Sequence, residues 1–383
     1  MAWTRNVREQ KEAVIRDYLS DQYTKKEMVQ RHGVSRQTIH KVIRRFKDDG
    51  PSGLEERSRR PKSSPAQISE EIVEEMLAFS AEYKSLSPRK VVERLEQVRP
   101  EVRWPAASTA YKIFERAGVH VPAKRRRRHR VIHPGKPRVE AKEPGELTTA
   151  DFKGQFRTRD GNYCYPLTIM DWSSRYLYAC QGFDSTEYGG VRRVFERVFR
   201  EHGLPRVVLT DNGTPFAAHG LGRLSRFHVW LMRLGVEPVT IEPGHPEQNP
   251  IHERMHRTLK EAVVVPPANN RQLQQKRFNR FVYEYNEQRP HDSLGKRTPG
   301  SIYRPSSRPF PTRASVFEYP SHFEVRKVAA NGSIKWKGLF YFLSGVLAAE
   351  RVGLEPIDYQ RWAIHLDSFE LARFDEAQGR IYV

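Results

Sequence analysis

Hydrophobic residues near the N-terminus recur at helical spacing on both sides of a turn. Met28 precedes Gly33, and Ile39 and Ile43 follow it. Positions separated by three or four residues share one face of a helix, so two helices joined at this glycine can bury a common apolar wedge. The pattern predicts a helix-turn-helix domain over residues 1–60.

The opposite face of the second helix in this pair is polar and basic. Ser35 stands where it can cap the first turn. A helix of this kind can present side chains to base edges and phosphates, and the alternative is a two-helix hairpin with a solvated basic face. We expect DNA binding here, through Ser35, Arg36, Gln37, His40, Lys41 and Arg44.

A second helical block over residues 67–122 has a similar but less regular pattern. Val91 and Leu95 lie before a turn, and either Ser108 or Thr109 can cap the helix that follows. The block is predicted to be a second helix-turn-helix-like DNA-binding domain, with a domain that serves only for packing as the alternative.

Residues 123–144 combine a run of basic side chains with repeated Pro and Gly, which favour an extended connector. Charge runs of this kind are usually solvated. The position of this one, between two predicted DNA-binding blocks and an acidic segment, favours contact with phosphates. The residues expected to make it are Arg125, Arg126, Arg127, Arg128 and Arg130.

Over residues 145–304 the pattern changes to short β-rich runs and helices. Three strand-like runs come first, and helices then alternate with strands in the order βββαβαβα. This order predicts an α/β layer with a mixed sheet. Residues 317–383 are strand-like throughout and are expected to form a small β-barrel, so the predicted fold class is multidomain, α followed by α/β and β.

The net charge of the chain indicates what kind of partner the protein binds. The chain has 66 Lys and Arg against 46 Asp and Glu, a formal net charge of +20. Such an excess indicates a polyanion, with nucleic acid ahead of an anionic membrane surface. No apolar run approaches the roughly 20 residues of a membrane span, and the N-terminus lacks the pattern of a secretory signal. We therefore expect a cytosolic protein.

Three carboxylates stand out against this positive charge. Asp151 lies in the first strand-like run of the α/β segment, and Asp211 directly follows the run VVLT and precedes Asn212-Gly213. Asp is normally depleted in strands, and α/β folds place ligand-binding groups at the carboxyl ends of strands. Glu253 lies in a predicted helix that begins at Pro250. Hard oxygen ligands on a rigid frame are what two-metal phosphodiester chemistry needs.

The helix of Glu253 has two distinct faces. Glu253, His256, Arg257 and Lys260 share one face by spacing, and apolar residues share another. A carboxylate among basic side chains could hold a metal while its neighbours hold DNA phosphates. The alternative is a solvated face with Glu253 and Arg257 as an ordinary ion pair, worth about 0.3–0.5 kcal/mol.

The strings DFKGQF, DNGTPF and GHPEQNPIHERMHRTLK, in this order behind two helix-turn-helix blocks, resemble the DDE transposases of bacterial insertion sequences, which have a retroviral-integrase-type catalytic core. The segment YNEQRPHDSLGKRTPGSIY is similar to the end of that core, and within it Arg289 and His291 either contact DNA or pack the core. The resemblance covers nearly the whole chain.

The resemblance implies an RNase H-like core with a five-stranded mixed sheet flanked by helices. It implies that Asp151, Asp211 and Glu253 ligate two Mg²⁺ ions, for which Mn²⁺ can substitute, and that no covalent protein intermediate forms. The implied activity is hydrolysis at the 3′ ends of the element followed by transfer of those ends into target DNA. The implied partners are terminal inverted repeats, target DNA and at least one further copy of the chain, in the bacterial cytosol.

This sequence departs from the family pattern at two places. Between Asp211 and Glu253 lie 41 residues, and the shorter spacing of many relatives would select Glu247. We prefer Glu253 because Glu247 precedes the helix and lacks the basic face. Pro250 and His252 also replace the usual residue types. The rival functions are a transcriptional regulator with an inactive core, a stand-alone RNase H-like nuclease, and a tyrosine or serine recombinase.

Overall fold

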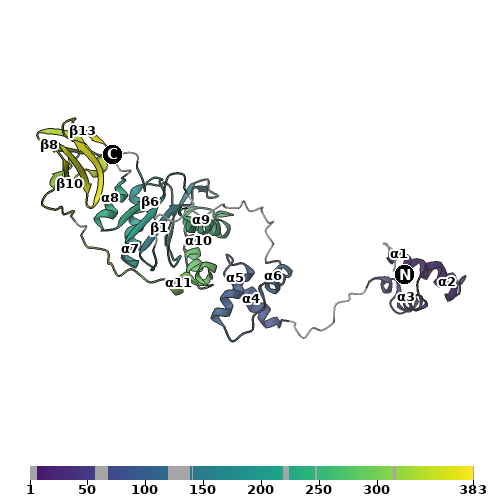
Figure 1. Cartoon of the computed structure of the whole chain (residues 1–383). Helices are drawn as coiled ribbons and strands as arrows, with labels where there is room; N and C mark the ends of the chain where they lie inside the picture. The colour runs from purple at the N-terminus through teal and green to yellow at the C-terminus, as the bar shows by residue number, and fades with distance from the viewer. Residues whose placement is uncertain are drawn as a thin grey trace. The chain divides into compact units, whose positions relative to one another are not determined.

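The computed structural model divides the chain into two compact units, Met1–Gln67 and Ile68–Val383 (Figure 1). It describes residues 7–56, 68–119, 139, 141–218, 224–245, 248–313 and 316–382. Several residues with predicted roles lie outside these ranges: Arg125, Arg126, Arg127, Arg128, Arg130 and the alternative acid Glu247.

The first unit contains three helices, α1 (Val7–Leu19), α2 (Lys25–His32) and α3 (Arg36–Asp49), and a short 3₁₀ turn, η1 (Gly50–Leu54). Its core is built from the apolar positions of the sequence pattern, including Met28, Ile39, Val42 and Ile43. The expected helix-turn-helix is thereby confirmed.

Local chemistry defines the turn between α2 and α3. Thr24 and Glu27 form a reciprocal capping box at the start of α2. Gly33 ends α2 with φ +63°, a conformation that glycine adopts without steric cost. The Ser35 hydroxyl accepts the Thr38 N–H at the start of α3, as predicted.

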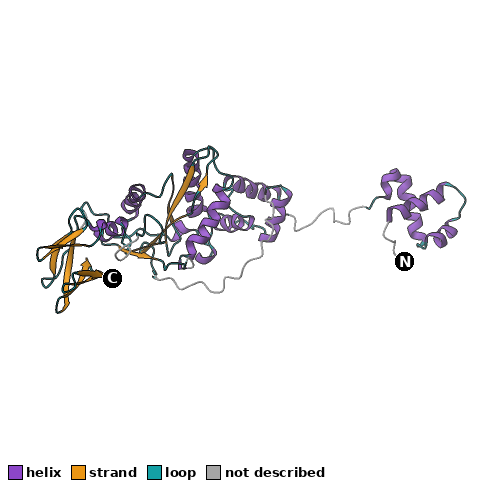
Figure 2. Cartoon of the chain, turned by 90° about the horizontal axis from the view of Figure 1, so that it is seen from above, coloured by secondary structure: helices purple, strands orange, loops and turns teal. Residues whose placement is uncertain are grey.

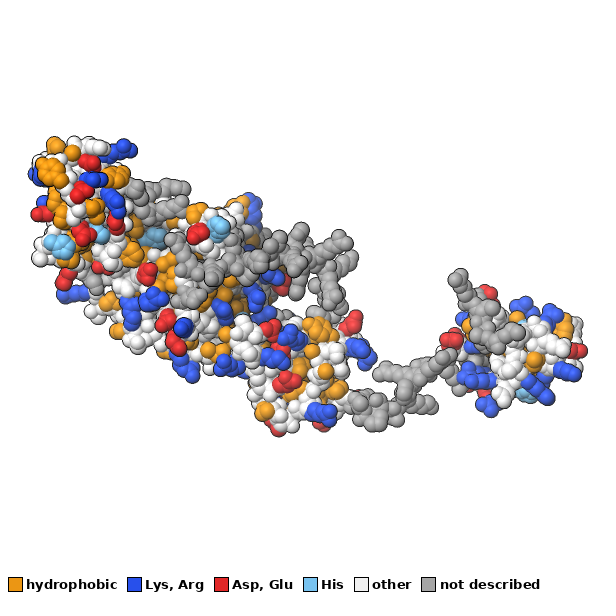
Figure 3. All heavy atoms as spheres, in the orientation of Figure 1, with side chains coloured by type: hydrophobic (Ala, Val, Ile, Leu, Met, Phe, Trp, Pro, Cys, Tyr) orange, Lys and Arg blue, Asp and Glu red, His pale blue; other side chains and the backbone are white. Residues whose placement is uncertain are grey.

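The side chains predicted to contact DNA from α3 are all exposed: Ser35, Arg36, Gln37, His40, Lys41 and Arg44. Lys and Arg side chains are visible at several places around the rim of this unit (Figure 3). The first unit therefore presents a basic helix to the solvent.

The second unit begins with a three-helix block, α4 (Glu70–Glu82), α5 (Pro88–Val98) and α6 (Ala107–Arg116). Val91, Leu95 and Phe114 are buried in its centre. The predicted cap of α6 is wrong, because the helix begins at Ala107, before Ser108 and Thr109. Ala106 occupies the N-cap position, and no side chain accepts a hydrogen bond there.

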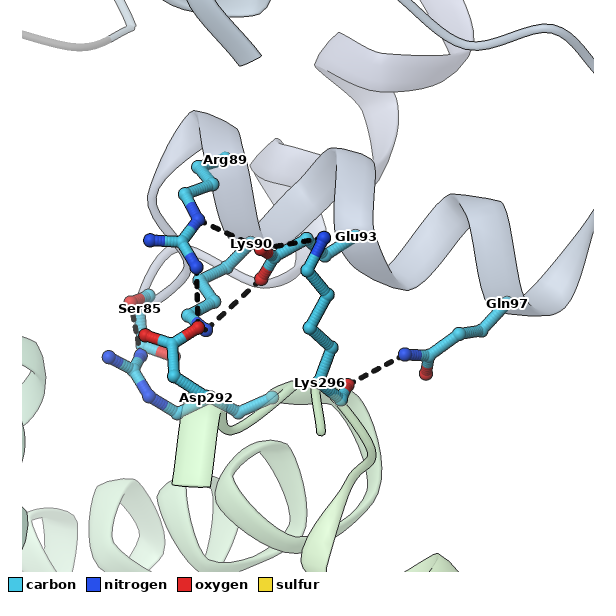
Figure 4. A network of polar contacts seen from close by, with 8 residues as sticks. Ser85, Arg89, Lys90, Glu93, Gln97, Asp292 and Lys296 are labelled. Atoms are coloured by element: carbon cyan, nitrogen blue, oxygen red, sulfur yellow. Dashed lines mark hydrogen bonds and ion pairs between the residues drawn. The ribbon is translucent and has the colours of Figure 1, made fainter. Parts of the chain in front are cut away.

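Helix α5 packs on the α/β segment through a network of polar contacts (Figure 4). Lys90 Nζ lies 3.1 Å from Glu93 Oε2 on its own helix and 3.1 Å from Asp292 Oδ1 across the interface. Gln97 donates to the Lys296 carbonyl at 2.7 Å, and Arg289 donates to the Ser85 carbonyl. The polar face of α5 thus binds the α/β segment and is not free for another partner.

A mixed sheet forms the centre of the second unit. Its long strands are β1 (Leu147–Phe152), β3 (Tyr163–Asp171), β4 (Leu177–Phe183), β5 (Val207–Thr210) and β6 (Glu237–Thr240), in the order β4-β3-β1-β5-β6. β1, β5 and β6 are parallel to one another, and β3 is antiparallel to both β1 and β4. The five expected strands are all present. A short strand that was not predicted, β2 (Phe156–Arg157), pairs with β3.

Helices cover both faces of this sheet. On one face, α7 (Tyr188–His202) and α8 (Arg226–Arg233) pack against apolar sheet residues such as Ala150 and Val208. On the other face, α9 (Pro250–Leu259) and α10 (Arg271–Tyr283) pack against Met170 and Cys180. π-Helical turns, η4 (Lys260–Val264) and η5 (Glu284–Gln288), continue α9 and α10; η6 (Asp292–Leu294) and α11 (Pro299–Ile302) follow.

The C-terminal strands form two separate sheets at one end of the unit (Figure 2). One sheet has the order β13-β12-β11-β10-β7, and β8 pairs with β9 in the other. The predicted barrel is not confirmed, since the pairings among the described strands leave both sheets open. These strands are β7 (Glu324–Lys327), β8 (Ser333–Trp336), β9 (Leu339–Phe342), β10 (Arg351–Asp358), β11 (Arg361–Leu366), β12 (Phe369–Asp375) and β13 (Arg380–Tyr382), with the 3₁₀ turn η7 (Gly345–Leu347) before β10.

Candidate active site

Two of the predicted carboxylates stand side by side at the carboxyl ends of neighbouring parallel strands. Ala150 of β1 is in register with Thr210 of β5, so the next residue of each chain segment, Asp151 and Asp211, occupies equivalent positions. The parallel pairing explains this neighbourhood, because strands that run in the same direction end at the same edge of the sheet.

Burial disfavours the ionised form of both carboxylates. Burial and the nearby Asp211 charge raise the pKa of Asp151 to about 7. Burial also raises the pKa of Asp211, while the Gly213 N–H, which donates to Asp211 Oδ1 at 3.1 Å, acts in the opposite direction. Two crowded acids at one edge of a sheet favour a bound cation, since its charge would relieve their repulsion.

The turn after β5 holds Asp211 in place. Asn212 donates to the Ile241 carbonyl at 2.7 Å, which ties the turn to the segment after β6. A Cβ atom built on Gly213 would lie 3.0 Å from Asp211 Oδ2. A larger residue at this position would therefore crowd the Asp211 carboxylate, which glycine does not.

The third predicted carboxylate approaches from helix α9. The helix begins at Pro250 with Asn249 as the N-cap residue, as predicted. The Asn249 side chain makes no cap hydrogen bond and instead accepts the Thr149 hydroxyl of β1 at 3.2 Å. Glu253 is exposed and lies 3.7 Å from Arg257. The Glu253–Arg257 ion pair, which the sequence offered as the alternative to a metal site, is thus present in the structure.

All three acids line one cleft of about 820 Å³. Three of the basic residues in its wall, Lys153, Arg257 and Lys260, come from two different elements and can hold an anionic backbone. Arg257 and Lys260 are exposed, as their predicted DNA-binding role requires. The other lining residues are Asn212, Gly213, Ile241, Glu242, Pro243, Gly244, His245, Asn249 and His256.

His256 differs from its predicted neighbours on the basic face. Its side chain is only 8 % exposed, and Nδ1 lies 3.7 Å from Asp151 Oδ2. Burial, with smaller contributions from His252 and Lys153, lowers the pKa of His256 to about 2. Burial thus disfavours the charged imidazolium, and Nδ1 faces the first acid, whereas the sequence pattern had assigned His256 to phosphate.

Sequence reasoning missed two participants at this point. The Thr168 hydroxyl of β3 lies 2.8 Å from His256 Nε2 and 3.2 Å from His252 Nδ1. Asp151, His252 and His256 each offer a ligand atom, and these atoms all lie within 4.8 Å of one another. The available signal was the four-residue spacing of the histidines, which places two imidazoles on one helix face and is typical of metal-binding helices.

Sequence comparison relates this part of the chain to known domains. Two family models, both described as "Integrase core domain", match residues 141–246 and 234–299. A "Helix-turn-helix domain" matches residues 10–62, and a "Homeodomain-like domain" matches residues 38–114. None of the described helices is long and apolar enough to cross a membrane.

Two curated relatives come from bacterial insertion elements. The 39.2 kDa protein of IS476 from Xanthomonas euvesicatoria is 25% identical over 210 residues, which are 54% of this chain and 57% of that protein. The 31.7 kDa protein of IS407 from Burkholderia multivorans is 25% identical over 203 residues, 50% of this chain and 67% of that protein. A match to an uncharacterized Caenorhabditis elegans protein spans 12% of its length.

Among solved structures, a chain of the simian T-cell lymphotropic virus intasome in complex with the PP2A regulatory subunit B56 gamma aligns with a TM-score of 0.38 and 14% identity, over 74% of this chain and 97% of that one. The domain models and the insertion-element relatives agree in content and order with the helix-turn-helix unit and the α/β segment. The chain therefore carries regions similar to an integrase core domain behind N-terminal regions similar to helix-turn-helix domains, in a sequence related to proteins of bacterial insertion elements.

Proposed function

We propose that this protein is a DNA transposase that binds the terminal repeats of its element, hydrolyses the phosphodiester at each 3′ end and transfers that end into target DNA. One observation carries the proposal: Asp151 and Asp211 end neighbouring parallel strands and share a single cleft with Glu253 and basic side chains. Carboxylates in this arrangement suit two divalent metal ions.

The residues present fit such ions. Burial and, after it, the nearby Asp211 charge raise the pKa of Asp151, so a bound cation would stabilise the charged form of these carboxylates. Asp151, Asp211 and Glu253 would hold the metal, with Mg²⁺ as the expected ion and Mn²⁺ as a substitute. Bound there, divalent ions supply charge stabilisation to the attacking and leaving oxygens of an in-line displacement.

The protein's own side chains position the DNA strand. Arg257 of α9 and Lys260 of η4 are exposed, and Lys153 directly follows β1; all three line the cleft. Cations in the wall of the cleft can hold phosphates near the scissile bond, which positions the strand without reading its sequence. Helix α3 of the first unit would supply sequence recognition from its exposed polar face.

Two ends must be cut and joined together for an element to move, so we propose that at least two copies of the chain act on DNA. Residues 123–144, with their basic run, would track phosphates between the DNA-binding blocks and the core. The helical block of residues 67–122 would act as a second DNA-binding module through α6, since its other polar helix, α5, is packed on the core.

The test uses the full-length protein and duplexes carrying the ends of the flanking element, with Mg²⁺ or Mn²⁺ added. We expect 3′-end cleavage and joined products, and Asp151→Asn, Asp211→Asn and Glu253→Gln should each reduce both by more than about 100-fold. Asp184→Asn is the matched control, because this exposed carboxylate follows β4 and pairs with Arg271 outside the cleft.

Each other outcome supports a different function. Cleavage without joining would support a nuclease, and sequence-specific binding without cleavage would support a transcriptional regulator. Loss of activity in Glu247→Gln but not in Glu253→Gln would move the third ligand to Glu247. Activity that survives all three acid substitutions would remove the two-metal mechanism.

A further inference from the structure

The hydroxyl of Thr168 is a junction of three hydrogen bonds beneath the acid pair. It donates to the Asp151 carbonyl oxygen at 2.9 Å. Its oxygen also lies 2.8 Å from His256 Nε2 and 3.2 Å from His252 Nδ1. A threonine hydroxyl has one proton and two lone pairs, so these three contacts use its whole capacity.

This junction fixes the tautomer of His256. Because the single Thr168 proton goes to the Asp151 carbonyl, the bond to His256 must use a proton on Nε2. A neutral imidazole with its proton on Nε2 has a free lone pair on Nδ1. That Nδ1 is the atom that lies 3.7 Å from Asp151 Oδ2.

The separation of these two atoms fits one shared ion. Typical bonds from a transition metal to imidazole nitrogen and to carboxylate oxygen are each about 2.0–2.2 Å long. Their sum exceeds the 3.7 Å between Nδ1 and Oδ2, so one ion can bind both atoms without moving either. Imidazoles that ligate metals usually donate their other N–H to a fixed acceptor, which is the part that Thr168 plays here.

We propose that His256 Nδ1 is a ligand of the metal ion that Asp151 binds, so that this position holds a mixed nitrogen and oxygen ligand set. Mg²⁺ takes oxygen ligands almost exclusively, whereas first-row transition metals accept imidazole. Of the two ions that the acids can hold, Mn²⁺ would therefore gain affinity from His256, whereas Mg²⁺ would depend on the carboxylates alone. The inference rests on the proposed function because it uses Asp151 as a metal ligand.

The burial of the histidines supports a dedicated site. His252 and His256 are 1% and 7% exposed, and imidazoles that serve only to contact DNA phosphate would have to reach the surface. Both rings instead lie inside the protein, in contact with the Thr168 hydroxyl, and His256 also faces Asp151.

The experiment is pulsed electron paramagnetic resonance on the full-length protein loaded with Mn²⁺ alone, without DNA. We expect ¹⁴N coupling to the bound Mn²⁺, and its replacement by ¹⁵N coupling when the histidines are isotopically labelled. His256→Gln should abolish the coupling and weaken Mn²⁺ binding by about tenfold or more, with Mg²⁺ binding changed by less than about twofold.

His228→Gln is the matched control. His228 is also a buried histidine of the second unit, but it lies on α8 and does not line the cleft. This variant should keep both the nitrogen coupling and the Mn²⁺ affinity. The labelled wild-type protein tests the inference even if His256→Gln does not fold, because its spectrum needs no substitution.

Failure of this inference can be separated from failure of the proposed function. Bound Mn²⁺ with oxygen ligands only, still lost in Asp151→Asn, would overturn the role of His256 and leave the acids as metal ligands. Nitrogen coupling that is lost in His252→Gln but kept in His256→Gln would also overturn it. An affinity for Mn²⁺ that is unchanged in both Asp151→Asn and Asp211→Asn would overturn the proposed function as well.

Discussion

The two N-terminal helical blocks have similar hydrophobic patterns but use their polar faces differently. In the first block, the basic face of α3 is exposed along its length, from Arg36 to Arg44. In the second block, the polar face of α5 binds the integrase core through Lys90, Glu93 and Gln97. In the same block α6 exposes basic residues, which include Lys112 and Arg116, whereas the charged residues that α4 exposes are acidic.

This difference shows why a charged helix cannot be assigned to DNA from its own sequence. Asp292 and Lys296 are about 200 positions away from α5 in the chain. Asp292 nevertheless accepts a hydrogen bond from Lys90, and the Lys296 carbonyl accepts one from Gln97. Whether a basic side chain is available to DNA can be judged only when its partners inside the protein are known. The first block is a separate compact unit, and the second block is part of the same unit as the core.

The largest expected effect follows from this division into units. Phe114 is 1% exposed in the core of the second block, so Phe114→Ala should lower the free energy of unfolding of residues 68–383 by about 3–5 kcal/mol. Ile39→Ala, in the core of the first block, should destabilise that unit alone. Calorimetry of the full chain checks both; a single transition that shifts in both variants would contradict the division.

Acid should weaken the unit that holds the second block. Burial, followed by the charges of Arg289 and Lys90, lowers the pKa of His291 to about 3. Since the unfolded chain takes up this proton near pH 6.5 and the folded chain does not, stability is lost as the pH falls below 6.5. His291 should contribute about 2 kcal/mol of destabilisation at pH 5.

Chemical denaturation of the wild type and His291→Gln at several pH values measures this contribution. The difference in the free energy of unfolding between the two proteins should be constant above pH 7 and should change steadily between pH 6.5 and pH 4. Other buried histidines of the unit affect both proteins equally and cancel in the comparison. Parallel curves across the whole range would show that His291 takes up its proton in the folded state as well.

DNA binding should distinguish exposed from paired basic residues. Replacing Arg36, Lys41 or Arg44 by Gln should each reduce the slope of log K against log salt by about one, the share of one phosphate contact. Replacing Arg89 or Lys90 by Gln should leave the slope unchanged, because both side chains contact Asp292. A reduced slope for the α5 variants would mean that the interface opens on DNA.

The smallest expected effect concerns the helix starts. Ser35 caps α3 with its side chain, but α6 has Ala106 at that position. Ala106→Ser should therefore raise the free energy of unfolding by about 0.5 kcal/mol, while Ser35→Ala should lower it by about 1 kcal/mol. Thermal unfolding measures both, and Ala106→Val is a suitable control because valine is as poor an N-cap residue as alanine and adds no side-chain acceptor.

Local patterns in the sequence predicted a large part of the fold. The strand runs around Asp151 and Asp211 were correct because alternation and strand composition are properties of neighbouring residues, and their parallel pairing brings the two acids together. The start of α9 at Pro250 was also correct, since proline at the first helical position has a local cause.

Features that depend on distant partners could not be predicted. The spacing of His256 placed it beside Glu253 on a polar face, but Thr168 of β3 and Asp151 of β1 draw its ring inward. Arg289 and His291 were left between DNA contact and packing, and the structure places Arg289 against Ser85. Strand content likewise predicted sheets at the C-terminus but could not determine whether they close.

The packing of α5 on the core also has a consequence for the DNA that such a protein can process. A sequence read by α6 would lie at a set number of base pairs from the bond cut in the cleft, because both belong to one unit. On the proposed function, element ends would then tolerate no change in the length of the spacer between this sequence and the cut.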